Sequence, residues 1–551
     1  MIDREIHLAR ALLIEGNALL RSVTAAQLKN LGVGQVSHAT RLKEARLTLE
    51  RESFDIVVCS REFDDSDHSG QDLLDELRRE QLLPHSTVFL MVTAQAAYHQ
   101  VVEAAEASLD GLLVRPFTAA ALGDRLAEAR NRKRALADVL RALDAGEFET
   151  AFVHALKRFQ DKQPYWAWCG RLAAELLLRL QRPADARKVF DRLVTTHGAA
   201  WSRLGVARAQ MATSDMAGAR GSIGVVLAEE PDCADAHDLL ARTLVEQSDF
   251  DGALDAYRRA ATITPGCLLR AQHVGALAFY QGREDEALAA LERSVTLGTQ
   301  SKLFDAQTLL LLAMLRFDQG NVHGVAAMLE QLQKYAQRFP ASKRLRRMEA
   351  AVKALGLLLG DGSSRSLDIA RRLGGEVNEP AFDLEAANVT LALWARLPHT
   401  LRPPGEHDAL IDRCAQRFCV SKAIAEVLCA AARRDPSAVS AIRRCQAQLT
   451  EIAETAMARS LKGDHRGAVA QLLEAGEAAH NAKLLEMGGA LARRHAAAIE
   501  GAEDLCARAA ELTRRWGHHS THIAGIQRSG RSPSGLQIRT VAPAPRAVAA
   551  A

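Results

Sequence analysis

The sequence predicts an N-terminal α/β domain with a doubly wound parallel sheet, then an all-α superhelical solenoid, then a disordered C-terminal tail. Strand-like apolar runs alternate with helical segments over residues 1–130. A repeat of about 34 residues follows them. Of the 551 residues, 48% are hydrophobic but only 5% are aromatic, which favours packed helices over sandwiches and barrels.

In the first domain, continuous apolar runs predict buried strands and amphipathic runs predict helices. The expected strands are 6–15, 54–59, 88–92 and 111–114, and the expected helices are 18–31, 42–51, 73–81, 98–107 and 119–135. Apolar strands between helices indicate a parallel sheet that is covered on both faces. Functional residues in such sheets lie at the carboxyl ends of the strands.

The segments at these strand ends resemble a known family. RALLIEGNALLR, FDIVVCSREF, MVTA and LLVRPFT are similar to the matching segments of the receiver domain of two-component response regulators, over about residues 9–126. Arg115, Pro116 and Phe117 stand where that family has Lys-Pro-Phe, and 22 residues separate Thr93 from Arg115, as in the family. The resemblance implies a flavodoxin-like fold, typically with a cis bond before this proline.

The resemblance also implies five site positions, and three of them depart from the family. The family uses an acceptor aspartate, two acidic residues that hold Mg²⁺, a hydroxyl residue and a lysine. Here Ser60 takes the acceptor position, Glu15 and Gly16 take the acidic pair, and Thr93 and Arg115 take the last two. Serine without an activating base is a weak nucleophile, and Glu15 alone is a weak metal ligand. We therefore expect a degenerate receiver that takes no phosphate and needs no cofactor.

Two alternatives concern the same site. A nearby acid could replace the missing acceptor with Mg²⁺ bound, the candidates being Glu62, Asp64, Asp65 and Asp67. Arg115 could instead form an anion site with Ser60 and Thr93 for free phosphate or a nucleotide, or pair with Glu15 and lock one conformation. We favour the ion pair over the anion site.

Small or β-branched residues mark the repeat in the middle of the chain. They are separated by 35, 33, 34, 34 and 38 residues, and they are Ala151, Ala186, Ala219, Ala253, Ala287 and Val325. This spacing and the residues of 234–265 resemble the tetratricopeptide (TPR) repeat, a helix–turn–helix unit of 34 residues. Gly275 repeats the small position of Ala241 one period later. The segment 201–205 is displaced by about two residues, and the unit near Val325 is four residues too long.

Composition suggests limits for each region. We expect a receiver-like domain at 1–130, a TPR array at 131–340, degenerate helical repeats at 341–400, a helical TPR-like region at 409–511 and a disordered basic tail at 512–551. The Pro-rich segment 395–408 is the best candidate boundary within the array. The tail has six arginines and no acidic residue, but its charge is too dilute to predict nucleic-acid binding.

The charge balance and cysteines narrow the class of protein. The net charge of +3 indicates neither a nucleic-acid nor a membrane surface. No apolar run approaches the ~20 residues that cross a bilayer, and residues 1–11 lack a signal-peptide pattern. Nine cysteines without a CxxC pair predict neither a disulfide framework nor a zinc site. We expect a cytoplasmic protein.

Together these features predict a bacterial signalling or scaffold protein of the two-component, phosphorelay type and not an enzyme, since no P-loop, HExxH or GxSxG pattern occurs. The TPR groove would bind a protein partner, and the resemblance implies a second binding face at 95–126, for a histidine kinase, another two-component protein or a second copy. The alternative is a switch in which an acid near Ser60 takes phosphate and gates TPR binding. Residues 119–139 are expected to join the two parts as one stiff helical segment.

Overall fold

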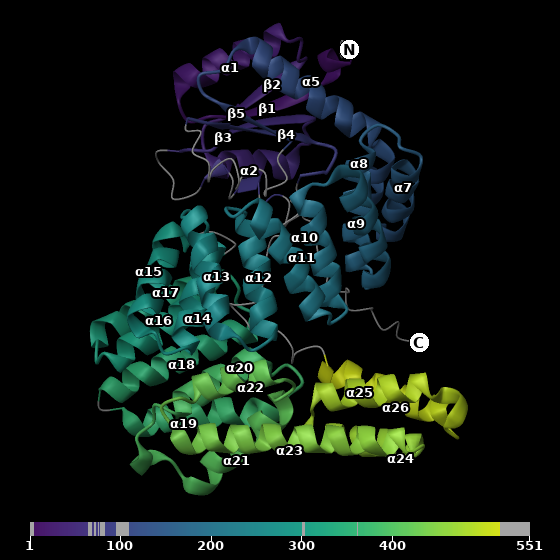
Figure 1. The fold of residues 1–551 in the computed structure, drawn as a ribbon. Coiled ribbons are helices and arrows are strands. Elements are labelled where there is room, and N and C mark those ends of the chain that lie inside the picture. Colours follow the sequence, from purple (N-terminus) through teal and green to yellow (C-terminus); the bar gives the residue numbers. More distant parts are fainter. Residues whose placement is uncertain are drawn as a thin grey trace, which may run out of the picture.

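The N-terminal domain is a five-stranded parallel sheet of order β2-β1-β3-β4-β5 (Figure 1). The computed structural model describes residues 5–63, 69–70, 73–74, 77, 83–94, 110–299, 304–360 and 362–517. The strands are β1 (Arg10–Ile14), β2 (Gln35–Ala39), β3 (Ile56–Ser60), β4 (Val88–Thr93) and β5 (Gly111–Val114). The bond between Arg115 and Pro116 is cis, as the resemblance implies.

Helices cover both faces of this sheet. The helices α1 (Ala18–Asn30) and α5 (Ala119–Ala135) pack on one face, where Leu28 and Leu122 meet Val58. The helix α2 (Leu42–Arg51) packs on the other face, where Leu49 meets Val57. Neighbouring strand residues point to opposite faces, so an uninterrupted apolar strand supplies both cores. The predicted doubly wound fold is confirmed.

The edges of the domain differ from the expectation. A 3₁₀ helix, η1 (Ile6–Leu8), occupies the start of the first predicted strand. Strand β2 was not among the predicted segments, because its sequence QVSHA is polar and all but its last residue are at least partly exposed. The predicted helix 98–107 lies outside the described residues, as does much of 73–81.

The sheet and the helical array are joined by an almost continuous helix. Only Leu136, which is buried, separates α5 from α6 (Ala137–Asp144). The end of α5 is tied back to the sheet because Arg132 donates a 2.7 Å hydrogen bond to Asp110, which is nearly buried. The backbone N–H of His85 donates to Asp144 on α6 over 2.8 Å. These contacts hold the first array helix against the domain.

The array consists of antiparallel helix pairs with the predicted period. The first helices are α6, α8 (Trp166–Arg179), α10 (Ala200–Ala212), α12 (Ala234–Glu246), α14 (Leu268–Tyr280) and α16 (Gln307–Asp318). Their partners are α7 (Phe148–Gln160), α9 (Pro183–His197), α11 (Met216–Glu229), α13 (Phe250–Ile263), α15 (Glu284–Gly298) and α17 (Val322–Gln337). The starts of α8, α10, α12 and α14 are each 34 residues apart.

Both departures from the period have structural reasons. Helix α10 begins in phase although its small residue is displaced, and Gly205 still faces the Phe190 ring, where an added Cβ would lie 2.2 Å from a ring carbon. The long unit near Val325 arises because 299–306 separates α15 from α16, whereas 264–267 separates α13 from α14. The extra residues lie between the two helices.

Eight more helices follow the repeats and turn back toward them. They are α18 (Lys343–Leu359), α19 (Ser363–Gly375), α20 (Leu384–Trp394), α21 (Pro404–Phe418), α22 (Lys422–Ala431), α23 (Pro436–Leu461), α24 (His465–Ala479) and α25 (Ala482–Arg494). The described chain then ends with α26 (Ala502–Trp516). Residues 512–516 therefore belong to a helix, because Leu512 and Trp516 are buried, and the predicted tail began too early; 518–551 lie outside the described residues.

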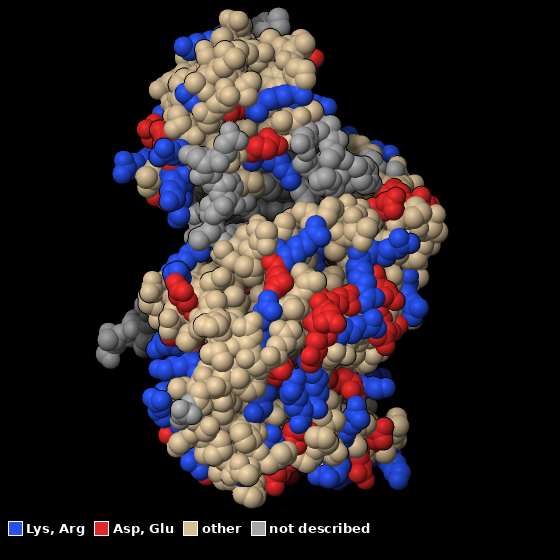
Figure 2. All heavy atoms as spheres, turned by 90° about the vertical axis from the view of Figure 1, so that its left-hand side faces the viewer, with Lys and Arg blue, Asp and Glu red and all other residues tan. Residues whose placement is uncertain are grey.

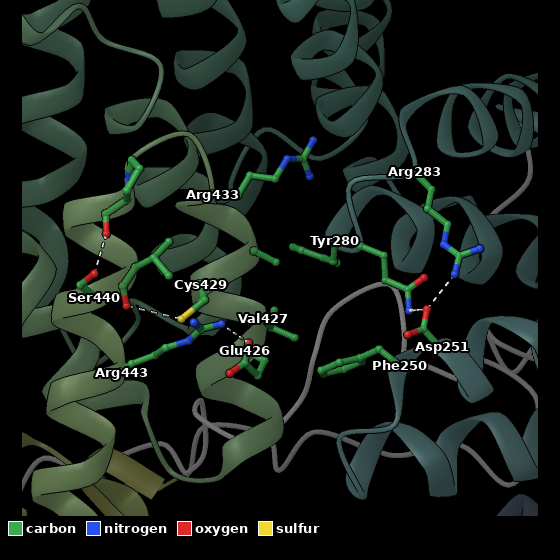
Figure 3. A pocket seen from close by; sticks show the side chains of 14 residues that line it. Phe250, Asp251, Tyr280, Arg283, Glu426, Val427, Cys429, Arg433, Ser440 and Arg443 are labelled. Carbon is green, nitrogen blue, oxygen red and sulfur yellow. Dashed lines mark hydrogen bonds and ion pairs between the residues drawn. The ribbon is translucent and has the colours of Figure 1, made fainter.

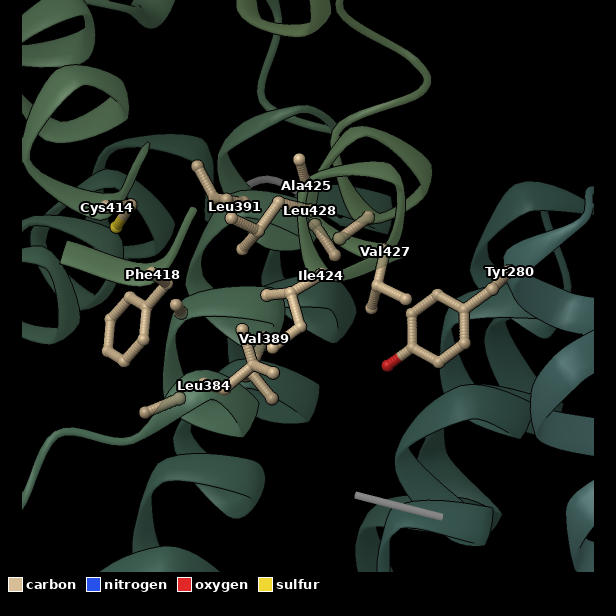
Figure 4. Packing of buried hydrophobic residues seen from close by; sticks show 14 of the residues in the cluster. Tyr280, Leu384, Val389, Leu391, Cys414, Phe418, Ile424, Ala425, Val427 and Leu428 are labelled. Atoms are coloured by element: carbon tan, nitrogen blue, oxygen red, sulfur yellow. The ribbon is translucent and has the colours of Figure 1, made fainter. Parts of the chain in front are cut away.

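These helices close the array into a ring. Helices α14, α16, α18, α20 and α22 each contact the next, and α22 returns to contact α14. Tyr280 of α14 packs toward Val427 of α22 (Figure 4), and all eleven residues of α20 are buried. One buried cluster runs from Ala241 to Trp516, across the predicted limits at 340, 400 and 409. The Pro-rich segment 395–408 contains η3 (His399–Leu401) and the first residues of α21, and it lies within this continuous core.

Buried charges hold the ring where its helices end. The guanidinium of Arg396, after α20, donates 2.9 and 2.6 Å hydrogen bonds to Asp318, the last residue of α16. Their side chains are 2% and 1% exposed. Burial lowers the pKa of Arg396, and the Asp318 carboxylate opposes that shift. Arg433, after α22, donates to the Phe279 carbonyl at the end of α14, where a cation also complements the helix dipole.

A cavity of about 790 Å³ opens at this seam between α13–α14 and α22–α23 (Figure 3). Phe250 and Tyr280 line one wall and Val427 lines the other, and the ion pair of Arg283 with Asp251 lies at its edge. Elsewhere, the face of the molecule in Figure 2 carries acidic and basic side chains interspersed, without a patch of one sign. Within the part of the chain that the structure describes, no helix is long and apolar enough to cross a membrane.

A buried histidine in the segment 395–408 makes the stability of the folded chain depend on pH. His407 stacks on Trp394, and its Nε2 lies 3.1 Å from Asp435. Burial lowers the pKa of His407, and Asp435 opposes the shift. As the pH falls, the unfolded chain takes up a proton on His407 near pH 6.5, whereas the folded chain does not. The contribution of neutral His407 to the free energy of unfolding is therefore present above about pH 6.5 and is lost below it.

We expect the urea midpoint of the wild type to fall between pH 7.5 and 5.5, and the fall to be smaller in His407→Gln. The measurement is helix content by circular dichroism across a urea series at both pH values. Equal falls in the two chains would contradict this role of His407.

Candidate functional site

The predicted site residues meet at one edge of the sheet. Glu15 follows β1, Ser60 ends β3, Thr93 ends β4 and Arg115 follows β5. The strands are parallel and in register, with Cys59 beside Ile14 and Thr93 beside Val114, so their carboxyl ends lie together. These are four of the five positions that the resemblance implies for the site, and the structure places them at one edge.

Glu15 and Arg115 form the predicted ion pair. The Arg115 guanidinium donates to Glu15 Oε2, and the Glu15 side chain is 6% exposed. The second oxygen, Oε1, accepts a 2.9 Å hydrogen bond from the backbone N–H of Asn17. Both carboxylate oxygens are therefore engaged by groups of the chain itself.

Ser60 lies beneath this pair and is 2% exposed. Its Oγ accepts a 3.3 Å hydrogen bond from Arg115 Nη2. The backbone at Gly70 crosses over the strand end so closely that a Cβ there would lie 2.1 Å from the Ser60 carbonyl oxygen. A guanidinium cannot accept the hydroxyl proton, so this neighbour does not activate Ser60 as a nucleophile.

The neighbouring thiol is equally unsuited to nucleophilic chemistry. Cys59 is fully buried on β3, and its burial together with the Glu15 charge holds the pKa of the thiol well above its usual range. The thiolate is the reactive form of cysteine, so Cys59 is a packing residue.

The described residues at this edge of the sheet do not fit a Mg²⁺ ion. Mg²⁺ is held by carboxylates, but Glu15 is occupied by Arg115 and Gly16 offers no side chain. The backbone would allow one, because a Cβ at Gly16 would make only ordinary contacts of 3.6 and 3.7 Å. Among the described residues, no group of three or more His, Cys, Asp or Glu could hold a metal ion.

Glu62 accepts a hydrogen bond from Thr93, a contact that the sequence does not predict. It was one of four acids considered as a replacement acceptor, but its Oε1 accepts a 2.6 Å hydrogen bond from the hydroxyl of Thr93. Its Oε2 lies 3.4 Å from the backbone N–H of Ala94, which donates to it. The other three acids, Asp64, Asp65 and Asp67, lie outside the described residues.

Comparisons with known proteins agree with this geometry. Residues 11–127 match the response regulator receiver domain. Over 117 residues, the chain is 33% identical to the chemotaxis protein CheY-3 of Vibrio cholerae, covering 88% of that protein and 21% of this chain. The chain belongs to the response regulator receiver family. The receiver is also 32% identical to the chemotaxis protein CheY of Pseudomonas aeruginosa, covering 92% of it and 21% of this chain.

Solved structures match both parts of the chain. The receiver matches the chemotaxis response regulator CheY4 of Vibrio cholerae, with 21% identity, 22% of this chain and 98% of that chain covered, and a TM-score of 0.20. A thermophilic TPR protein of Thermus thermophilus matches with 19% identity, 32% and 94% coverage, and a TM-score of 0.26. The protein MamA matches with 19% identity, 29% and 93% coverage, and a TM-score of 0.26.

The residues at the expected site positions are thus engaged by other groups of the chain. Arg115 neutralises the one remaining acidic residue, Ser60 is covered, and Glu62 takes the hydroxyl of Thr93. The proposed second binding face at 95–126 is described only from residue 110 onward. Of that part, Leu122 and Leu126 are buried against the sheet.

Proposed function

We propose that this response-regulator-like signalling protein uses its receiver without phosphorylation, as a docking module, and binds a protein partner through its TPR array. The contact that supports the first part is the ion pair between Arg115 and Glu15 over the buried Ser60. The Arg115 guanidinium thus lies at the expected acceptor position, where phosphoryl transfer would otherwise take place. We propose no catalytic activity and no cofactor.

The partner would be a histidine kinase, another two-component protein or a second copy of the chain. In the ring, the first helices α14, α16 and α20 are buried by the chain itself. The proposed partner surface is therefore on the open repeats α7–α13, and the receiver face would provide a second one. We also propose a cytoplasmic location, which the nine free cysteines favour.

Intact mass spectrometry tests phosphate independence. The purified chain is incubated with Mg²⁺ and acetyl phosphate, beside a receiver that retains the acceptor aspartate as a positive control. We expect no gain of mass, because Ser60 is covered and lacks a base.

A gain of one phosphoryl group that requires Mg²⁺ and is lost in Glu15→Ala would contradict the proposal. It would support the alternative, in which an acid near Ser60 accepts phosphate and gates TPR binding.

A further inference from the structure

Thr93 and Ala94 present two hydrogen-bond donors at the end of β4. The Thr93 hydroxyl is fully buried, and the Ala94 N–H follows it where the strand stops. A hydroxyl and a backbone N–H that point to one place suit an oxyanion, and hydrogen bonds to an ionised acceptor are stronger than neutral ones. These donors already have an oxyanion, because one oxygen of the Glu62 carboxylate faces each of them.

The same edge of the sheet also carries a positively charged side chain, that of Arg115. Arg115 stands over Glu15, where a divalent cation would otherwise bind, and its backbone N–H donates a 2.9 Å hydrogen bond to the Thr93 carbonyl. The cation and the anion are thus connected through one residue, Thr93. Both charges that phosphoryl transfer would bring from outside are supplied by side chains of this chain.

We propose that Glu62 is the resident oxyanion of this receiver: its carboxylate fills the Thr93 and Ala94 donor site and holds the β4–β5 edge in one arrangement as soon as the domain folds. The inference rests on the proposed phosphate independence and gives it a mechanism. A receiver filled in this way presents one conformation to its partner and to α5, whatever the phosphate supply.

Hydrogen–deuterium exchange on the full chain, without any phosphoryl donor, tests the role of Glu62. The peptides of interest cover 88–94 and 111–118. We expect exchange there to be about tenfold faster in Glu62→Ala, because it loses a 2.6 Å hydrogen bond to a charged group and a second, weaker one of 3.4 Å. Glu62→Gln keeps an acceptor oxygen but loses the charge, so its exchange should be about threefold faster. Glu50→Ala, which removes an acid paired with Arg46 on α2, is the control and should match the wild type.

Three outcomes would overturn the inference. Exchange in Glu62→Ala equal to that in Glu50→Ala would show that the carboxylate holds nothing, and unchanged exchange in Glu62→Gln would show that its charge is irrelevant. Thr93→Val removes the donor and leaves Glu62 in place. Its effect should be in the same direction as that of Glu62→Ala and should not add to it in the double variant, so additive effects would also overturn the inference.

Failure of the inference is distinguishable from failure of the proposed function. Phosphoryl labelling of the wild type would refute phosphate independence, whatever the exchange rates are. Unlabelled wild type together with unchanged exchange would leave phosphate independence standing and remove Glu62 as its cause.

Discussion

Replacing Asp318 with alanine is expected to lower the stability of the helical ring by about 3–5 kcal/mol, because it leaves a buried arginine charge without its partner. Arg396 is 2% exposed and directs two hydrogen bonds to Asp318, and Arg434 adds a third contact of 3.1 Å to the same carboxylate. The measurement is the urea midpoint of helix content, read by circular dichroism.

The matched control for Asp318→Ala is Glu330→Ala. Glu330 pairs with Lys334 on α17, but both side chains are about two-thirds exposed, so its loss should leave the urea midpoint nearly unchanged. Equal midpoints for the two variants would contradict the assigned role of Asp318. An effect on the midpoint without a change of slope would show that the ring unfolds with the same exposed surface as in the wild type.

The second large effect is the recovery of phosphoryl transfer by redesign of the receiver site. A chain with Gly16→Asp, Ser60→Asp, Arg115→Lys and Glu62→Ala should gain one phosphoryl group from acetyl phosphate with Mg²⁺. The two new aspartates supply an acceptor and a metal ligand, the lysine releases Glu15, and the loss of Glu62 frees the donors of Thr93 and Ala94. The backbone at Gly16 has room for the added side chain.

Two control chains decide what the redesign has shown. The same chain with Ser60 retained should remain unlabelled, because it lacks the acceptor carboxylate. The chain with Glu62 retained should label about tenfold more slowly, since the carboxylate competes for one charge-assisted hydrogen bond. Labelling without the acceptor aspartate would contradict the assignment of position 60, and equal rates with and without Glu62 would contradict its competition for Thr93.

The sequence predicted those parts of the fold that repeat a strong local pattern. Strands β1, β3, β4 and β5 are apolar runs, and the small residues of the helix pairs recur with a near-constant spacing. Strand β2 was missed because it is polar and lies at an edge, where pairing and not burial determines its structure. The ring was missed because Arg433 and Phe279 are 154 residues apart, and no periodicity relates them.

The contacts of the candidate site could also be predicted only in part. Glu15 and Arg115 could be paired from sequence, since each follows a strand whose end lies at the same edge. The position of Glu62 could not be predicted, because it follows a strand by two residues and its direction depends on the loop that it enters. From the sequence, Asp64, Asp65 and Asp67 in the same loop are equally good candidates for a contact with the site.

The closed ring sets where mechanical strain can be absorbed in this protein. An open solenoid distributes a twist over all its repeats, because each repeat touches only its neighbours. Here α22 is anchored to α14, so a torque applied by the receiver through α5 and α6 is resisted by the ring as a single stiff body. The elastic part of the molecule is then confined to the repeats α7–α13, which makes them a short torsional spring between two rigid ends.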